Sequence, residues 1–192
     1  MGGRRKRNLD LRGGVFVIGE GITEQYYFKH LKYLRKYNCV VKPRFFGKTS
    51  IAEIEKSVKK LLLGGISIIC VFDADVSERD ISEKEKLNQF KRKYQRNSDV
   101  IICDSFPSIE FWFLLHFVKT SKHFQNSKAV ERELNKFVID YSKTKNYLKN
   151  IRWVEQLVEK IETACDNAKS IEQVDGCSYS NIFIAIEQLE SI

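Results

Sequence analysis

The sequence has little that would anchor it in a membrane or cross-link it covalently. No apolar run approaches the roughly 20 residues that a membrane-spanning helix needs. The basic N-terminal residues are not followed by the apolar stretch of a signal peptide. The five cysteines lie far apart and form no CxxC pair, which argues against a zinc site or a disulfide framework. We therefore expect a soluble, cytoplasmic protein that makes no membrane contact.

The signatures of several enzyme classes are also missing. There is no GxSxG nucleophile motif, no GxxxxGK[ST] phosphate loop, no GxGxxG dinucleotide motif and no HExxH zinc motif. Only two prolines occur, and no low-complexity tract or internal repeat is visible. The 192 residues are 43% hydrophobic and 12% aromatic, which is enough to form a proper core. One compact domain, alone or with a small appendage, is the expectation.

Positive charge is in excess, with 33 Lys and Arg against 25 Asp and Glu and a net charge of +8. Such an excess favours phosphate-rich partners through long-range attraction, although charged residues are also ordinary on solvated helix surfaces. The clusters RRKR at 4–7 and KRKYQR at 91–96 favour nucleic acid as the partner. The residues predicted to bind nucleic acid are Arg4, Arg5, Lys6, Arg7 and Lys48.

Apolar runs predict four strands that alternate with helices. The strands are expected at 15–18, 39–46, 66–72 and 99–103. The run ISIICVF at 66–72 is apolar without alternation, which is typical of a strand buried on both faces of a parallel sheet. Strands alternating with helices indicate β-α-β units and an α/β fold.

Helix signals separate these strands. Thr23 is expected to cap a helix that extends to about residue 37, and Ser50 to cap a second helix that ends at Gly64-Gly65. A polar helix is expected at 82–95.

The pattern changes after Pro107. An apolar helix is followed by residues 128–192, which predict three or four more helices without a clear strand. We divide the chain into a basic arm at 1–13, an α/β core at 14–106 and a helical extension at 107–192 that packs on the core.

Carboxylates follow two of the expected strands. Glu20 comes just after the first strand, and Asp73 and Asp75 follow the strand at 66–72. Ligands of α/β sheets bind beyond the carboxyl ends of the strands, so we expect these side chains to meet. Carboxylates desolvated together repel one another, and Mg²⁺ relieves the repulsion because it takes oxygen ligands. The sequence therefore predicts a Mg²⁺ site, with Mn²⁺ as substitute, in which Glu20 shares the metal or moves a proton.

Two further acids are candidates for the catalytic site. Glu24 either joins the cluster or is an acid in the first turn of the helix that interacts favourably with the helix dipole. Glu110 lies in the first turn of the apolar helix after Pro107, where it either faces the cluster or binds a backbone amide. His116 comes six residues later and points to roughly the opposite side of an ideal helix. We interpret His116 as a core or interface residue and not as a ligand.

Three segments together resemble a known family. They occur in the order VFVIGEGITEQYYF, ISIICVFDADV and FPSIEFWFLLHF. In this order and spacing they resemble RloB-like proteins, a bacterial family with a TOPRIM domain. The resemblance implies a TOPRIM (Rossmann-like) core at 14–106, with a mostly parallel four-stranded sheet flanked by helices and followed by the helical extension. TOPRIM domains are Mg²⁺-dependent catalytic modules with a glutamate after the first strand and a DxD after a later one, which falls on Glu20, Asp73 and Asp75.

The third segment carries the resemblance with one departure. The family's proline, acidic residue, tryptophan and histidine map to Pro107, Glu110, Trp112 and His116. The family commonly has Asn-Pro where this chain has Phe106-Pro107, so no polar role is carried over to position 106.

The resemblance also implies a function in bacterial defence against phage, at restriction-linked loci. It implies a partner ATPase of the ABC or AAA type encoded in the same locus, and a homo-oligomer is compatible with it. We predict a Mg²⁺-dependent nuclease that cleaves DNA or RNA such as tRNA and acts as the toxin effector in abortive infection. One alternative is a non-catalytic nucleic-acid-binding or regulatory subunit. A primase-like nucleotidyltransferase is disfavoured because no accessory nucleotide or zinc module is apparent.

Overall fold

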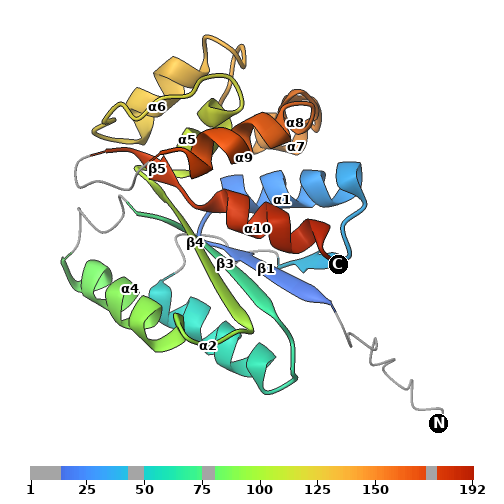
Figure 1. The fold of residues 1–192 in the computed structure, drawn as a ribbon, viewed down its shortest axis with the longest axis vertical. Helices are drawn as coiled ribbons and strands as arrows, with labels where there is room; N and C mark the ends of the chain where they lie inside the picture. The colour runs from blue at the N-terminus through green and yellow to red at the C-terminus, as the bar shows by residue number, and fades with distance from the viewer. Residues whose placement is uncertain (1–13, 43–49, 75–80, 172–176) are drawn as a thin grey trace.

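The computed structural model describes residues 14–42, 50–74, 81–171 and 177–192 (Figure 1). The elements in chain order are β1 (Val15–Gly19), α1 (Ile22–Arg35), β2 (Cys39–Val41), α2 (Ile51–Leu62), β3 (Ile68–Asp73), α4 (Ile81–Tyr94), β4 (Val100–Phe106), α5 (Ile109–Leu115), α6 (Ser127–Leu134), α7 (Lys145–Lys149), α8 (Arg152–Val158), α9 (Ile161–Lys169), β5 (Tyr179–Ser180) and α10 (Ile182–Glu190). No helix within these ranges combines the length and the apolar character needed to cross a membrane.

The strands form a five-stranded sheet in the order β2-β1-β3-β4-β5. Strands β1 to β4 run parallel to one another, and β5 runs antiparallel to β4. From β1 the chain goes first to β2 on one side and then to β3 on the other. In an α/β sheet such a reversal leaves a crevice beyond the carboxyl ends of the two central strands, where ligands bind. The crevice here lies beyond β1 and β3.

The predicted four-stranded sheet is wrong by one strand. β5 pairs with the end of β4 through Ser105–Ser180 and Phe106–Tyr179. It lies in the segment for which the sequence predicts helices without a strand. Two residues are too few to show the alternation from which a strand is recognised in a sequence, so no pattern indicated β5.

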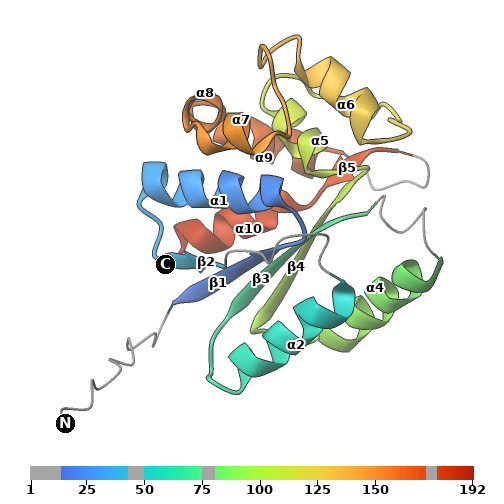
Figure 2. The same cartoon turned by 180° about the vertical axis from the view of Figure 1, so that it is seen from behind.

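Helices cover both faces of the sheet, as Figures 1 and 2 show. α2 and α4 lie side by side on one face, and α1 and α10 lie on the other. Ile68, Cys70 and Phe72 of β3 enter the apolar cluster beneath α2 and α4, whereas Ile69 and Val71 enter the cluster beneath α1. β3 is thus buried on both faces, as its run of apolar residues predicts.

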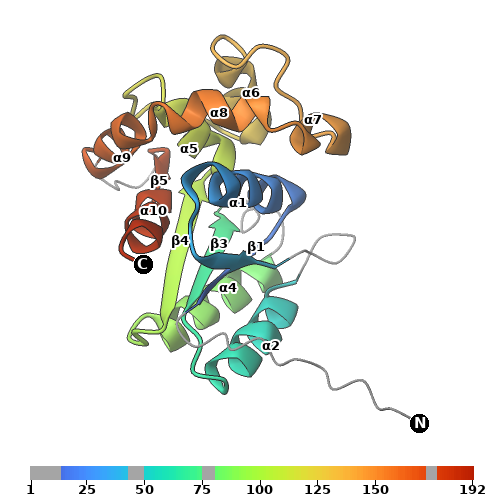
Figure 3. The ribbon, with the colours of Figure 1, turned by 90° about the vertical axis from the view of Figure 1, so that its right-hand side faces the viewer.

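The segment after Phe106 packs on the α1 side of the sheet (Figure 3). Every residue of α5 is buried, because this helix lies against β4, α6 and α9. Its Trp112 donates a hydrogen bond from Nε1 to the hydroxyl of Tyr27 in α1, over 2.8 Å. One apolar cluster extends from Val15 to Leu189. The C-terminal half therefore shares its core with the sheet.

The helix starts agree with the sequence at one position and differ at another. Ser50 caps α2 in a capping box with Glu53, as predicted. Thr23 does not cap α1: the N-cap is Gly21, which makes no side-chain cap hydrogen bond, and Thr23 lies within the first turn. The helix therefore starts two residues earlier than predicted, after a turn of only Glu20 and Gly21 that follows β1.

Candidate functional site

Two acids occupy the crevice at the carboxyl ends of β1 and β3. Glu20 directly follows β1, and Asp73 is the last residue of β3. The backbone N–H of Asp73 donates to Oε2 of Glu20 over 3.4 Å. The strand ends meet, as the order of strands and acids in the sequence predicts. Glu20 is buried and Asp73 is partly exposed, so the crevice keeps access to solvent on the Asp73 side.

The absence of side chains at two glycines leaves room for Glu24 against the end of β1. A Cβ atom at Gly19 would lie 2.6 Å from Cβ of Glu24, and one at Gly21 would lie 2.6 Å from its Oε2. Real Cβ contacts are not that short, so glycine at both positions lets the Glu24 side chain lie close to the backbone of the turn. Glu24 is 3% exposed as a result. Its Oε2 is buried and has no hydrogen-bond partner among the described residues.

Asp73 is tied to the start of α5. Its Oδ1 accepts a hydrogen bond from the backbone N–H of Ile109 over 2.9 Å. Free N–H groups in the first turn of a helix are natural partners of an acceptor. This bond fixes the direction in which the Asp73 carboxylate points, and it brings α5 with Glu110 to the crevice.

Glu110 is the most enclosed acid of the site, with no exposed surface. Ser108 donates from Oγ to its Oε2 over 2.6 Å, and Tyr141 donates from its hydroxyl to Oε1 over 2.9 Å. Lys143 forms an ion pair with the same Oε2 over 3.0 Å. Of the two roles open to Glu110 in the sequence, the structure therefore favours a place beside the acidic residues, held by side chains.

Lys143 balances part of this negative charge. Besides Glu110, its Nζ contacts Oε1 of Glu131 in α6 over 3.1 Å. Burial opposes the charge of Lys143, but the two glutamates outweigh this effect and raise its pKa above the ordinary value. The lysine is therefore held in its charged form, and its charge also acts on Asp73 in the crevice.

Burial and neighbouring carboxylates oppose the ionisation of Glu24 and Asp73. Burial raises the pKa of Glu24 to about 7, with further increases from Glu110 and Glu20 and a partial offset from backbone hydrogen bonds. Burial also raises the pKa of Asp73 well above its usual range, and the charges of Glu24, Glu110 and Glu20 add to this effect. Such mutual repulsion is the state that a bound cation would relieve.

Part of the predicted site lies outside the described residues. These are Asp75, Arg4, Arg5, Lys6, Arg7 and Lys48. Within the ranges that the structure describes, no group of three or more His, Cys, Asp or Glu side chains is arranged to hold a metal ion. Glu20, Glu24, Asp73 and Glu110 are brought together in one acidic crevice, but they do not by themselves form a ready metal site.

His116 lies in the apolar core, as interpreted from the sequence. It is buried, and its Nδ1 donates to the backbone carbonyl of Trp112 over 2.9 Å. Burial lowers its pKa to about 4, so the imidazole is neutral at physiological pH. Its Nε2 has no hydrogen-bond partner among the described residues.

Tyr141 and Lys143 belong to the site although no sequence pattern predicts them there. Both follow α6 in the chain, and they contact an acid more than thirty residues earlier. Nothing in the stretch YSKTK distinguishes these residues from an ordinary polar loop. Only the packing of the C-terminal half against α5 brings them to Glu110.

Comparison with known proteins supplies one match. The family whose members are described as RloB-like proteins matches residues 15–189, which is most of the chain. Neither the curated proteins nor the solved structures contain a match.

Proposed function

This chain belongs to the RloB-like family, and we propose that it is a Mg²⁺-dependent nuclease that hydrolyses phosphodiester bonds of DNA or RNA. The observation that carries the proposal is the buried Oε2 of Glu24, an acceptor without a donor among the described residues of an acidic crevice. We further propose that residues 14–106 form a TOPRIM-like core. In this proposal the protein is a cytoplasmic effector of a bacterial antiphage system, controlled by a partner ATPase.

A divalent cation fits the chemistry of the crevice. A buried acceptor that lacks a donor costs free energy, and so does a set of carboxylates that repel one another. A cation bound by carboxylate oxygens would relieve both costs. We assign Glu20, Glu24 and Asp73 as the residues that would hold Mg²⁺, or Mn²⁺ in its place.

Asp75 is a necessary part of this assignment. The described residues contain no ready group of three ligands, so a further carboxylate is needed. Asp75 follows Asp73 by two residues and is the nearest acid in the chain. A small number of carboxylates is sufficient, because Mg²⁺ keeps several waters and takes its other oxygens from substrate phosphates.

The residues of the chain have separate tasks in this proposal. When bound, Mg²⁺ would stabilise the charge that develops on the phosphodiester oxygens. Glu24, whose pKa is raised by burial to about 7 in the metal-free protein, would lose its proton when it binds the cation near neutral pH. Asp73 is oriented by the N–H of Ile109, and Glu20 by the N–H of Asp73. Lys143 lowers the cost of gathering these acids.

A second candidate function is a non-catalytic nucleic-acid-binding or regulatory subunit. The lack of a ready three-ligand group within the described residues favours it. In this alternative the fold and the acids are kept, and a partner supplies the activity. The two candidates differ in whether the purified protein cleaves nucleic acid.

The test combines cleavage with metal-dependent stability. The purified protein is incubated with DNA and with total RNA, with and without the partner ATPase, in Mg²⁺, Mn²⁺ or EDTA. Thermal melts under the same metal conditions follow. The nuclease proposal expects cleavage in metal, none in EDTA, and a stabilisation of about 2.7 kcal/mol once the metal reaches about 100 times its Kd. No cleavage of either substrate under any condition would favour the regulatory subunit.

Asp73→Asn separates the role of the charge from the role of the fold. The amide keeps an oxygen that can accept from the N–H of Ile109 and removes one of the repelling charges. The variant should therefore be at least as stable as the parent in EDTA, but should lose cleavage and most of the metal-induced stabilisation. Asp166→Asn, at an exposed position of α9, is the matched control. An Asp73→Asn protein that melts far below the parent in EDTA and still cleaves would refute the proposal.

A further inference from the structure

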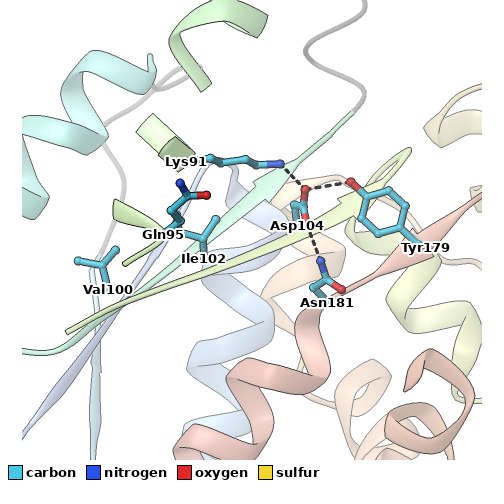
Figure 4. A pocket seen from close by; sticks show the side chains of 7 residues that line it. All are labelled: Lys91, Gln95, Val100, Ile102, Asp104, Tyr179 and Asn181. Carbon is cyan, nitrogen blue, oxygen red and sulfur yellow. Dashed lines mark hydrogen bonds and ion pairs between the residues drawn. The ribbon is translucent and has the colours of Figure 1, made fainter. Parts of the chain in front are cut away.

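A pocket of about 430 Å³ lies beside β4 on the α4 side of the sheet (Figure 4). The pocket has an apolar floor formed by Val100 and Ile102 of β4. Its polar lining consists of Lys91 of α4, Gln95 just after α4, Asp104 of β4, Tyr179 of β5 and Asn181, the N-cap of α10. An apolar base with a few converging polar groups is the usual composition of a small-ligand site.

Asp104 fixes the polar side of the pocket. Its Oδ1 accepts from Nδ2 of Asn181 over 2.9 Å, and its Oδ2 accepts from the hydroxyl of Tyr179 over 2.9 Å and pairs with Lys91. A carboxylate offers about four lone-pair sites, and these described residues occupy three of them. The amide of Gln95 adds a donor and an acceptor at the rim.

The charge of the pocket favours an uncharged ring over a phosphate. Lys91 and Asp104 form an ion pair, so their charges cancel at the centre of the lining. What is left for a ligand is an apolar floor, hydrogen-bonding groups of both kinds and the ring of Tyr179. A nucleobase presents the matching features, a flat ring with donors and acceptors along its edge.

Aromatic rings continue from the pocket toward solvent. Tyr179 stacks with Phe106 at 6.5 Å between ring centroids and 19° between planes, and Phe106 stacks with His123 at 5.7 Å and 25°. His123 is exposed, and Phe106 and Tyr179 are partly exposed. A row of nearly parallel rings with an accessible end is a platform on which unpaired bases stack.

The pocket runs along β4 from Val100 to Asp104, and its Asp104 end comes next to the strand position that faces the acidic crevice. Asp104 lines the pocket, and the next residue, Ser105, pairs in register with Asp73. Three exposed cations are sequence neighbours of the residues of the pocket and the platform. They are Arg92 after Lys91, Arg96 after Gln95, and Lys122 before His123. A strand held at the crevice would therefore find a base site and phosphate-binding side chains beside it.

We propose that this pocket and the His123–Phe106–Tyr179 platform form a subsite for unpaired nucleotides. One base enters the pocket against Gln95 and Asp104, and a base further along the same strand stacks on His123. The inference rests on the proposed nuclease function for the identity of the strand, and it narrows the substrate to nucleic acid with single-stranded segments. Bases within a duplex are already paired and stacked, so they cannot enter.

The test measures binding of a labelled oligonucleotide of mixed sequence, single-stranded or annealed to its complement, by fluorescence anisotropy in EDTA. RNA and DNA versions are both used. The variants are His123→Ala, Gln95→Ala and the double variant, all at exposed positions that a melt should confirm as folded. The double variant should bind single strands at least about fivefold more weakly, because base–aromatic stacking is lost. Its affinity for the duplex should change less than about twofold.

The control is Tyr33→Ala, which removes an aromatic ring that is 75% exposed on α1. It should leave both affinities unchanged. Nucleoside monophosphates added as competitors distinguish the source of the base: displacement of the labelled strand means that the site also takes free nucleotides, and no displacement means that it requires a strand. Equal affinities of parent and double variant for single strands, or an equal loss on duplex, would overturn the subsite.

The outcome is separable from that of the nuclease proposal. Absence of cleavage in metal, with the single-strand effect of the double variant intact, would reject the nuclease and keep the subsite. If the parent cleaves in metal and the double variant binds single strands as tightly as the parent, the nuclease is kept and the subsite is rejected.

Discussion

Glu24 is placed where burial and neighbouring charges both oppose its ionisation. It is 3% exposed, and it interacts electrostatically with Glu110 and Glu20. Its backbone position in the first turn of α1 would suit a solvated acid that answers the helix dipole. The two glycines instead turn the side chain inward, so that its charge becomes dependent on pH and on any cation bound beside it.

We expect the metal-free protein to lose stability as the pH rises from about 4.5 to about 7. Glu24 has its ordinary pKa of 4.5 in the unfolded chain, whereas burial raises its pKa to about 7 in the folded protein. Between these values the folded state binds more protons, so raising the pH lowers the free energy of unfolding, by up to about 3 kcal/mol. Urea midpoints measured across this range in EDTA test the effect.

Glu24→Gln is the decisive comparison in this series. It removes the titrating group, so the fall in stability with pH should become smaller. Asp73, whose pKa burial also raises, should leave a residual slope of the same sign. A variant with the full slope of the parent would show that Glu24 does not titrate in this range.

Lys143 should matter more for stability than an ordinary surface lysine. In Lys143→Ala the buried Glu110 keeps its hydrogen bonds from Ser108 and Tyr141 but loses its ion pair. Breaking a buried pair costs about 3–5 kcal/mol. The lysine side chain is 36% exposed, and we therefore expect about 1–3 kcal/mol, measured by urea unfolding at pH 7.

Lys136→Ala provides the reference for this change. Lys136 pairs with Glu133 at the surface, and its side chain is 64% exposed. Exposed pairs contribute about 0–1 kcal/mol. Equal losses in the two variants would mean that the charge of Lys143 has no special relation to the acidic crevice.

At the scale of elements, local sequence patterns predict the burial of a strand and the edge of the sheet at which the acids lie. The apolar run of β3 predicts burial on both faces, and the order of strands and acids places Glu20 and Asp73 at one edge. β5 and the pair Tyr141 and Lys143 had no such signal, because each depends on contacts with residues distant in the chain. Local periodicity carries no information about those contacts. The sequence predicts the cap of α1 at Thr23 because threonine is a preferred N-cap residue, whereas the structure has Gly21 there, where a Cβ would clash with the carboxylate of Glu24.

The turn between β1 and α1 should be sensitive to any side chain at its glycines. Gly19→Ala places a Cβ 2.6 Å from Cβ of Glu24, which is close to the backbone and cannot easily move. We expect a loss of about 1–3 kcal/mol from overpacking. In Gly21→Ala the clash is with the carboxylate end of Glu24, which can rotate away, so the loss of stability should be smaller.

The two glycine variants should also separate stability from metal binding. Movement of the Glu24 carboxylate in Gly21→Ala should reduce the stabilisation by Mg²⁺ or Mn²⁺ even where the fold is kept. Thermal melts in EDTA and in metal measure both quantities. A Gly21→Ala protein with the full metal response of the parent would exclude Glu24 as a ligand.

At the scale of the molecule, one apolar core connects parts of the chain that the sequence assigns to different segments. The cluster beneath α1 joins residues of β1, α1 and β4 to all the helices from α5 to α10. The same packing delivers Lys143 to Glu110, and it places Tyr179 of β5 beside Asp104 of β4. The proposed catalytic crevice and the proposed nucleotide subsite therefore both depend on the docking of the C-terminal half.

We expect the chain to unfold in a single cooperative transition. A sheet with α1 and α2 but without the helices after α5 would expose the apolar cluster that includes Tyr27 and Phe28, so a chain ending at residue 126 should show no cooperative unfolding. Far-UV circular dichroism reports on the whole chain, and the fluorescence of Trp112 and Trp153 reports on the C-terminal half. Their urea transitions should coincide in the full-length protein.

Deletion of residues 1–13 is the control, because the predicted basic arm should affect nucleic-acid affinity and its salt dependence but not this transition. If the chain ending at residue 126 unfolded cooperatively with the stability of the full-length protein, the core would be divided and the C-terminal half would be a separate unit.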